Sequence, residues 1–238
     1  IYPFFDTLVN SFKTIGAFNV SKWCGLANYK KLTVDESLWH TLFNTFRYVI
    51  FTVPLTIILS FACGASEYEK LKGRGIYRVI YFLPYVTMAT AIAAVWKWMF
   101  NGDFGLINYI LGLFGIKGQQ WVTNSAIAPY SIIVVTIGSL GYNMIILLAG
   151  IQGISPTYYE AAEIDGAGVV AKFFNITLPL LLFFVFILIT GLIGAFQIFD
   201  TIFMMIGKNT VVLENTQSVV MYFYRNAFDL VIKDTHVR

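Results

Sequence analysis

Long apolar runs constrain this chain more than any other feature of its sequence. A helix needs about 20 apolar residues to cross roughly 30 Å of hydrocarbon at 1.5 Å per residue. The chain is 58% hydrophobic and 12% charged, with a mean hydropathy of +0.71, which is far too apolar for a soluble domain of its length. We therefore expect an all-α, multi-pass integral membrane protein, with complete spans at 43–65, 76–100, 126–151 and 178–206.

The segments at the two ends of the chain are too short or too polar to cross a membrane. Residues 1–18 look like the outer end of a span whose beginning is absent. Residues 207–238 look like an outer polar loop, at 207–217, followed by an incomplete last segment that contains Arg225 and Asp229 and stops at a charged tail. The last span is therefore expected to be missing.

Three features within the apolar part predict local structure. Pro54 lies near the centre of its expected span and permits a kink there, because proline frees a carbonyl group, and the span at 76–100 is expected to be kinked near Pro84. Arg47 lies near one end of a span and is expected to extend to the lipid headgroups, although a functional role stays open. Residues 106–114 are too few to cross and predict a helix lying in the membrane interface.

A polar stretch of about twenty-five residues, 153–177, separates the last two complete spans, and ordered connections of this length usually have a function. Ser155 and Pro156 predict a helix start, because serine accepts from unpaired amides and proline has a preset φ. The helix should end near Ile164, because Gly166 and Gly168 can adopt a left-handed φ.

Small and acidic residues in this stretch have a recognisable spacing: Glu160, Ala161, Ala162, Gly166, Ile176, Leu178 and Pro179. The set resembles the cytoplasmic "EAA" loop of permease subunits of binding-protein-dependent ABC importers, whose short helix docks into a cleft on an ATPase subunit. The resemblance implies that 153–177 is a coupling loop, with contacts made by Tyr158, Glu160, Ala161, Ala162, Asp165 and Gly166. An amphipathic helix on the membrane surface is the alternative, but it does not explain the glycine and Leu-Pro spacing.

Two other segments resemble sugar-type members of that family, namely 25–29 (Gly-Leu-Ala-Asn-Tyr) and 196–200 (Phe-Gln-Ile-Phe-Asp). The resemblance implies a helical bundle of the type I ABC importer permease fold in the bacterial plasma (inner) membrane. A cytoplasmic coupling loop then places residues 67–75 inside the cell and 16–42, 101–125 and 207–217 outside.

Residues for catalysis are not recognisable in the sequence. It has no Gly-x-x-x-x-Gly-Lys-Ser/Thr phosphate loop, and its two histidines, His40 and His236, lie far from any cluster of carboxylates. We predict no catalytic residue, cofactor or metal ligand. A net charge of +3, spread over loops, excludes nucleic acid as a partner. The resemblance implies two ATP-binding cassette ATPase subunits, a second permease subunit and an extracytoplasmic solute-binding protein, with membrane lipid around the spans.

Polar side chains inside the expected spans are candidates for the substrate path, because they are costly in hydrocarbon. Tyr142 and Asn143 lie in the span before the coupling loop, and Phe196, Gln197 and Asp200 share a helix face in the span after it, by their spacing. Amide and carboxylate groups suit sugar hydroxyls, and aromatic rings suit sugar C–H faces. The alternative is that these groups bond neighbouring helices.

The sequence thus predicts a permease subunit that forms half of the path for a sugar, with an oligosaccharide expected. A phosphate-bearing solute would call for Arg or Lys in the path, and 126–151 and 178–206 contain neither. Import of glycerol phosphate, a polyol or an amino acid stays open. A channel or a structural membrane subunit is the alternative from another class, and it does not account for the coupling loop.

Overall fold

The computed structural model describes residues 2–15, 21–68, 74–138, 140–181, 183–207 and 209–229. The chain divides into two units, Ile1–His40 and Thr41–Arg238. The charged tail at 233–238 and the basic turn at 69–73 lie outside the described residues.

The first unit consists of two helices and an antiparallel hairpin: α1 (Tyr2–Ser11), β1 (Lys13–Ile15), β2 (Ser21–Trp23) and α2 (Ala27–Thr33). The amide of Asn28 donates to the carbonyl oxygens of Ser11 at 2.8 Å and Lys13 at 3.0 Å. These bonds satisfy carbonyl groups where α1 stops. The prediction for 1–18 was therefore wrong in extent, because the helix ends at Ser11 and an unpredicted hairpin follows.

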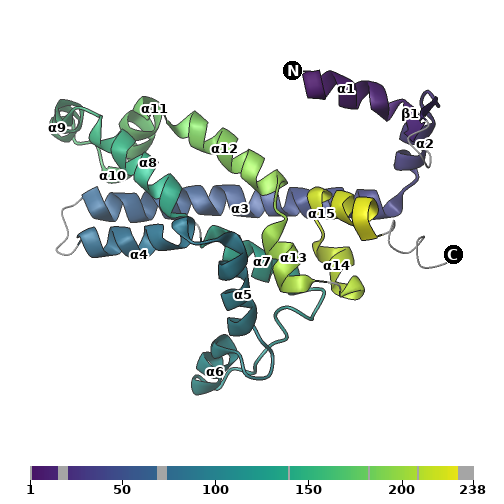
Figure 1. The fold of residues 1–238 in the computed structure, drawn as a ribbon. Coiled ribbons are helices and arrows are strands. Elements are labelled where there is room, and N and C mark those ends of the chain that lie inside the picture. The colour runs from purple at the N-terminus through teal and green to yellow at the C-terminus, as the bar shows by residue number, and fades with distance from the viewer. Residues whose placement is uncertain are drawn as a thin grey trace. The chain divides into compact units, whose positions relative to one another are not determined.

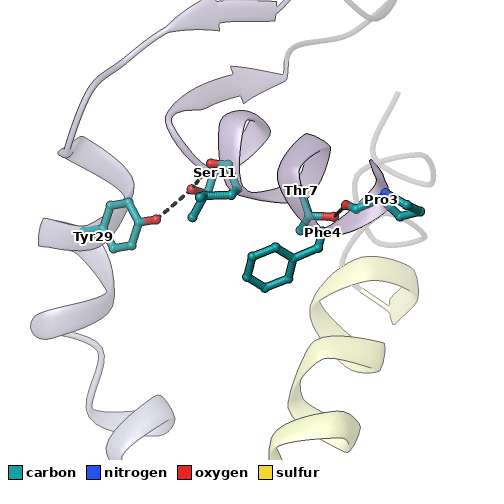
Figure 2. A pocket seen from close by; sticks show the side chains of 6 residues that line it. Pro3, Phe4, Thr7, Ser11 and Tyr29 are labelled. Carbon is teal, nitrogen blue, oxygen red and sulfur yellow. Dashed lines mark hydrogen bonds between the residues drawn. The ribbon is translucent and has the colours of Figure 1, made fainter. Parts of the chain in front are cut away.

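A shallow groove lies between α1 and α2 (Figure 2). It is lined by Pro3, Phe4, Thr7, Leu8, Ser11 and Tyr29. The hydroxyl groups of Ser11 and Tyr29 lie 2.6 Å apart in a hydrogen bond, and Thr7 donates to the carbonyl oxygen of Pro3 at 2.8 Å. These three hydroxyl groups are thus already paired, and none of the predicted site residues lines this groove.

The long helix α3 (Glu36–Tyr68) continues through Pro54. Its residues Glu36–Gly64 are long and apolar enough to cross a membrane. A polar residue recurs at every fourth position on its inner side: Asn44, Tyr48, Thr52, Thr56 and Ser60. Its outer side exposes large apolar side chains, including Phe43, Ile50 and Ile58. A helix that buries its polar ridge and exposes its apolar face is suited to hydrocarbon rather than to water.

The rest of the second unit is helical as well (Figure 1). Outside the loop at 153–177, the elements are α4 (Arg74–Val86), α5 (Ala89–Met99), α6 (Leu106–Leu113), α7 (Ala128–Ile137), α8 (Gly141–Gln152), α11 (Leu178–Leu180), α12 (Phe184–Phe196), α13 (Asp200–Ile206), α14 (Thr210–Thr216), α15 (Val219–Tyr224) and the π-helical turn η3 (Arg225–Asp229). The short helix predicted at 106–114 is confirmed as α6.

Two of the expected spans are each divided into two helices. The axes of α4 and α5 differ by 103°, and those of α7 and α8 by 43°. The sequence predicted a kink near Pro84, but α4 ends two residues later, at Val86. The hydroxyl of Thr87 donates to the carbonyl oxygen of Leu83 at 2.8 Å, so a carbonyl at the end of α4 is satisfied outside the helix. Phe184–Ile206 is a second segment that could cross a membrane by length and composition.

The polar loop predicted at 207–217 is wrong, because most of it forms helix α14. Asn209 caps this helix by accepting from the amide of Val212 at 3.4 Å, and the side chains of Val212 and Leu213 are buried. Arg47 of α3 donates to the carbonyl oxygen of Asn215 at 2.6 Å, near the C-terminal end of α14. Arg47 therefore binds a helix terminus, where a positive charge is favourable, instead of only anchoring to headgroups.

Candidate functional site

The helix predicted between Pro156 and about Ile164 is confirmed as α9 (Pro156–Ile164). Pro156 occupies the first turn, and Ser155 before it has an extended backbone. The predicted cap by the Ser155 side chain is wrong. Its hydroxyl instead forms a hydrogen bond of 2.9 Å with the hydroxyl of Thr157, so the start of α9 rests on the preset φ of proline.

The end of α9 is a Schellman motif. The amide of Gly166 donates to the carbonyl oxygen of Glu163 at 3.0 Å, and the amide of Ala167 donates to that of Ala162 at 2.8 Å. Gly166 has a φ of +74°, as predicted. Gly168 does not share this role, because its φ is −71° and it precedes the next helix, α10 (Val169–Lys172).

We expect Gly166→Ala to destabilise the end of α9 by about 1–2 kcal/mol, because a Cβ is disfavoured in the left-handed region. Amide hydrogen exchange of peptides covering α9 in the purified protein should rise by roughly 5- to 30-fold. Gly168→Ala is the matched control, since φ is negative there and no atom lies within 4 Å of the added Cβ. Equal exchange in the two variants would show that the left-handed residue does not hold the helix end.

One side of α9 is attached to the rest of the loop. The hydroxyl of Tyr159 lies 3.0 Å from that of Thr177, which is buried, and Lys172 forms an ion pair of 2.7 Å with Glu163. The predicted contact residues are exposed or half-buried: Tyr158, Glu160, Ala161, Ala162, Asp165 and Gly166. The structure therefore brings all six together on α9 and its C-terminal turn, and Tyr159 and Glu163 attach this helix to the rest of the loop.

Ile164 is an exposed residue of this surface that the sequence reasoning used only as a helix end. Its side chain is 87% exposed, and Tyr158 on the same helix is 54% exposed. Ile164 follows Ala161 by three positions, which places the two side by side on a helix. An apolar residue next to a small one on a polar surface helix was the signal that could have identified it.

The loop also contacts the long helix α3. After α10, the chain forms a π-helical segment, η2 (Phe173–Thr177), which leads into Pro179. A π-helical segment before proline is one way to accommodate the missing amide and the bulk of the ring. The ring of Phe173 packs edge-on against that of Phe61 in α3, with centroids 5.2 Å apart. A movement of the loop would therefore reach α3 through direct aromatic contact.

Tyr142 and Asn143, the first two path candidates, have different surroundings. The ring of Tyr142 stacks on that of Tyr85 in α4, with centroids 4.9 Å apart. Tyr142 therefore joins two helices, as the alternative interpretation predicted. Asn143 is half-buried, and no hydrogen bond of its side chain is found among the described residues.

Phe196, Gln197 and Asp200 do not share a helix face, and that prediction was wrong. Helix α12 ends at Phe196 and α13 begins at Asp200, so residues 197–199 form a break. Phe199 has φ −137° and ψ −60°, which is outside the helical region. Gln197, the first residue of the break, and Asp200, directly after it, are exposed. Phe196 packs edge-on against Phe46 of α3, with centroids 5.7 Å apart.

Helix α9 and the helix break at 197–199 are two separate places. Helix α9 lies near one end of α3, whereas α13, α14 and α15 lie toward the other end (Figure 1). Among the described residues, no group of three or more His, Cys, Asp or Glu side chains could hold a metal ion.

Comparison with known proteins supplies the family. The family described as "Binding-protein-dependent transport system inner membrane component" matches residues 42–224. The chain is 34% identical to the probable ABC transporter permease protein YesP of Bacillus subtilis, over 96% of this chain and 75% of YesP. It is 32% identical to the trehalose/maltose transport system permease protein MalF of Thermococcus litoralis, over 86% of this chain and 70% of MalF.

A solved structure has the same fold. It is that of a bacterial alginate ABC transporter in complex with an alginate pentasaccharide-bound periplasmic protein. The match covers 97% of this chain and 78% of the matched chain, with a TM-score of 0.78 and 20% sequence identity. The mostly helical architecture with membrane spans is thus that of an ABC importer permease. The chain belongs to the family of binding-protein-dependent transport system inner membrane components, and it is the permease subunit, not the catalytic subunit, of an ABC importer.

Proposed function

We propose that this permease forms half of the import path for a sugar, with an oligosaccharide as its substrate. The observation that carries this proposal is the break at 197–199, at and beside which Phe196, Gln197 and Asp200 are all exposed. Such groups can bond sugar hydroxyls and contact sugar C–H faces. The similarity to a trehalose/maltose permease supports a sugar of this class.

A phosphate-bearing solute such as glycerol phosphate fits these residues less well. The carboxylate of Asp200 would repel a phosphate, and Arg and Lys are absent from 126–151 and 178–206. Uptake by the assembled transporter should therefore be measured for labelled maltose, trehalose, longer oligosaccharides, glycerol phosphate, a polyol and an amino acid. Saturable uptake of glycerol phosphate alone would overturn the sugar proposal.

We also propose that the exposed side of α9 docks on a cytoplasmic ATPase subunit. Its attachment through Tyr159 and Glu163 leaves the exposed side chains of Tyr158, Glu160 and Asp165 accessible to a partner. Closure of the ATPase pair would then move α9, and the contact between Phe173 and Phe61 would transmit the movement to α3. A second permease subunit would complete the path, and an external binding protein would deliver the sugar. The complex of the alginate transporter with a pentasaccharide-bound periplasmic protein supports the role of such a binding protein.

Gln197→Ala should weaken uptake of the identified sugar roughly tenfold, because a polar group that the sugar would bond is removed. The loss should appear in the KM for uptake, measured with the binding protein in excess. Thr190→Val is the matched control on α12, since the hydroxyl of Thr190 already donates to the carbonyl oxygen of Phe186 within that helix, at 2.8 Å. An unchanged KM in Gln197→Ala would remove Gln197 from the substrate path.

A further inference from the structure

Ser218 is a fully buried residue whose hydroxyl connects two segments that lie apart in the sequence. Its Oγ accepts from the amide of Met221 at 3.2 Å and so caps the start of α15. The same hydroxyl donates to the carbonyl oxygen of Ile198, which lies in the break between α12 and α13. Ser218 therefore uses both its donor and its acceptor capacity.

The break needs a donor of this kind. Residues 197–199 leave the helical path, so carbonyl groups at the end of α12 lose their partners within the helix. Inside a membrane no bulk water replaces these partners, and an unpaired carbonyl group strongly favours a return to regular helix. The hydroxyl of Ser218 pairs the carbonyl group of Ile198, so this group no longer favours a regular helix.

The position of Ser218 is itself fixed by α3. Four side chains within one stretch of α3 bond the backbone of residues 214–219, the segment that contains Ser218. Asn44 donates to Glu214 O (3.0 Å), Arg47 to Asn215 O (2.6 Å) and Tyr48 to Thr216 O (2.7 Å), and Thr45 accepts from Val219 N (3.0 Å). Consecutive bonds of this kind allow residues 214–219 little freedom to shift along α3.

We propose that Ser218 is a positioning residue for the substrate path, because its hydroxyl holds open the helix break that presents Gln197 and Asp200. This rests on the proposed function, in which those two side chains line the path. In a regular helix, each side chain points about 100° away from that of the preceding residue. Residues 197–199 would follow this rule if they became helical. Gln197 and Asp200 would then occupy a different arrangement relative to α3.

Cysteine labelling in the assembled transporter tests this without knowledge of the sugar. Gln197→Cys, Ile198→Cys and Asp200→Cys are made singly, with Cys24 and Cys63 replaced by serine, and treated with a membrane-impermeant maleimide. We expect rapid labelling at 197 and 200 and slow labelling at the buried position 198. Ser218→Gly removes the hydroxyl at little cost to the helix cap. It should change the rates at 197 and 200 by roughly fivefold or more, whereas Ser218→Thr should keep the original pattern.

Asn209→Gly is the matched control, because Asn209 caps α14 as Ser218 caps α15. No hydrogen bond joins its side chain to residues 197–199 within the described chain. Unchanged labelling in Ser218→Gly, or an equal change in Asn209→Gly, would overturn the inference. If Ser218→Thr does not fold, the comparison of labelling in Ser218→Gly and Asn209→Gly tests the inference. Resistance of positions 197 and 200 to the reagent while Ser218 is intact would instead contradict the proposed path.

Discussion

Glu160→Lys should abolish substrate uptake while the protein still folds and reaches the membrane. Glu160 is exposed on α9, and within the described chain it forms no ion pair, so the substitution breaks no internal salt bridge. At a docking surface, reversing a charge that pairs with the partner costs about 2 kcal/mol or more, which corresponds to roughly 30-fold weaker docking. Uptake in vesicles measures the loss of transport. Co-purification of the ATPase subunits with the tagged permease measures the weaker docking.

The double variant Glu163→Lys with Lys172→Glu is the matched control for this charge reversal. It introduces the same change of Glu to Lys three positions away, but it preserves the ion pair between residues 163 and 172 in reversed order. Because the reversed pair keeps residue 163 bonded within the loop, we expect uptake to stay near that of the unmodified protein. Normal uptake in Glu160→Lys would refute the docking role of α9, and loss in both variants would indicate a general charge effect.

Gly141→Ala should cause a large loss of stability, because Gly141 lies where α8 packs against the backbone of α4. A Cβ at position 141 would lie 2.2 Å from the carbonyl oxygen of Tyr81 and 2.8 Å from Cα of Phe82. Both are backbone atoms of α4, so the two helices would have to separate. Overpacking that displaces backbone costs about 3 kcal/mol. Thermal unfolding of the purified protein in detergent should show a clearly lowered Tm.

Gly194→Ala controls for the loss of a glycine from a membrane helix. Among the described residues, no atom outside the local backbone of α12 lies within 4 Å of a Cβ at position 194. Alanine is favoured over glycine inside a helix by about 0.5–1 kcal/mol, so the Tm should be unchanged or slightly higher. Equal Tm values for the two alanine variants would mean that α4 and α8 do not pack as closely as the structure indicates.

Much of helix α9, the proposed docking helix, could be predicted because its determinants are local. Pro156 and Gly166 set the two ends of α9 through their own backbone preferences, and those preferences do not depend on the rest of the fold. The spacing of Glu160 and Asp165 then fixed where they lie on that helix. The capping role predicted for Ser155 was wrong because a neighbouring hydroxyl, that of Thr157, competes for it.

The surroundings of the path candidates were predicted less well because their geometry depends on distant residues. Helical spacing placed Phe196, Gln197 and Asp200 on one face, yet the chain breaks between them and Ser218, twenty positions away, bonds the break. The ring of Tyr142 stacks on that of Tyr85, and no local sequence pattern indicates this contact.

The sequence by itself determined that this is a membrane protein with a polar loop between its spans, since hydrocarbon thickness sets the length of apolar runs and proline and glycine act locally. Tertiary structure alone decided that α14 is a helix and that Arg47 binds its end. It also decided where the span after the loop breaks. The physical reason is that backbone groups in a membrane must find partners, and which side chain reaches a freed carbonyl group depends on how distant segments pack.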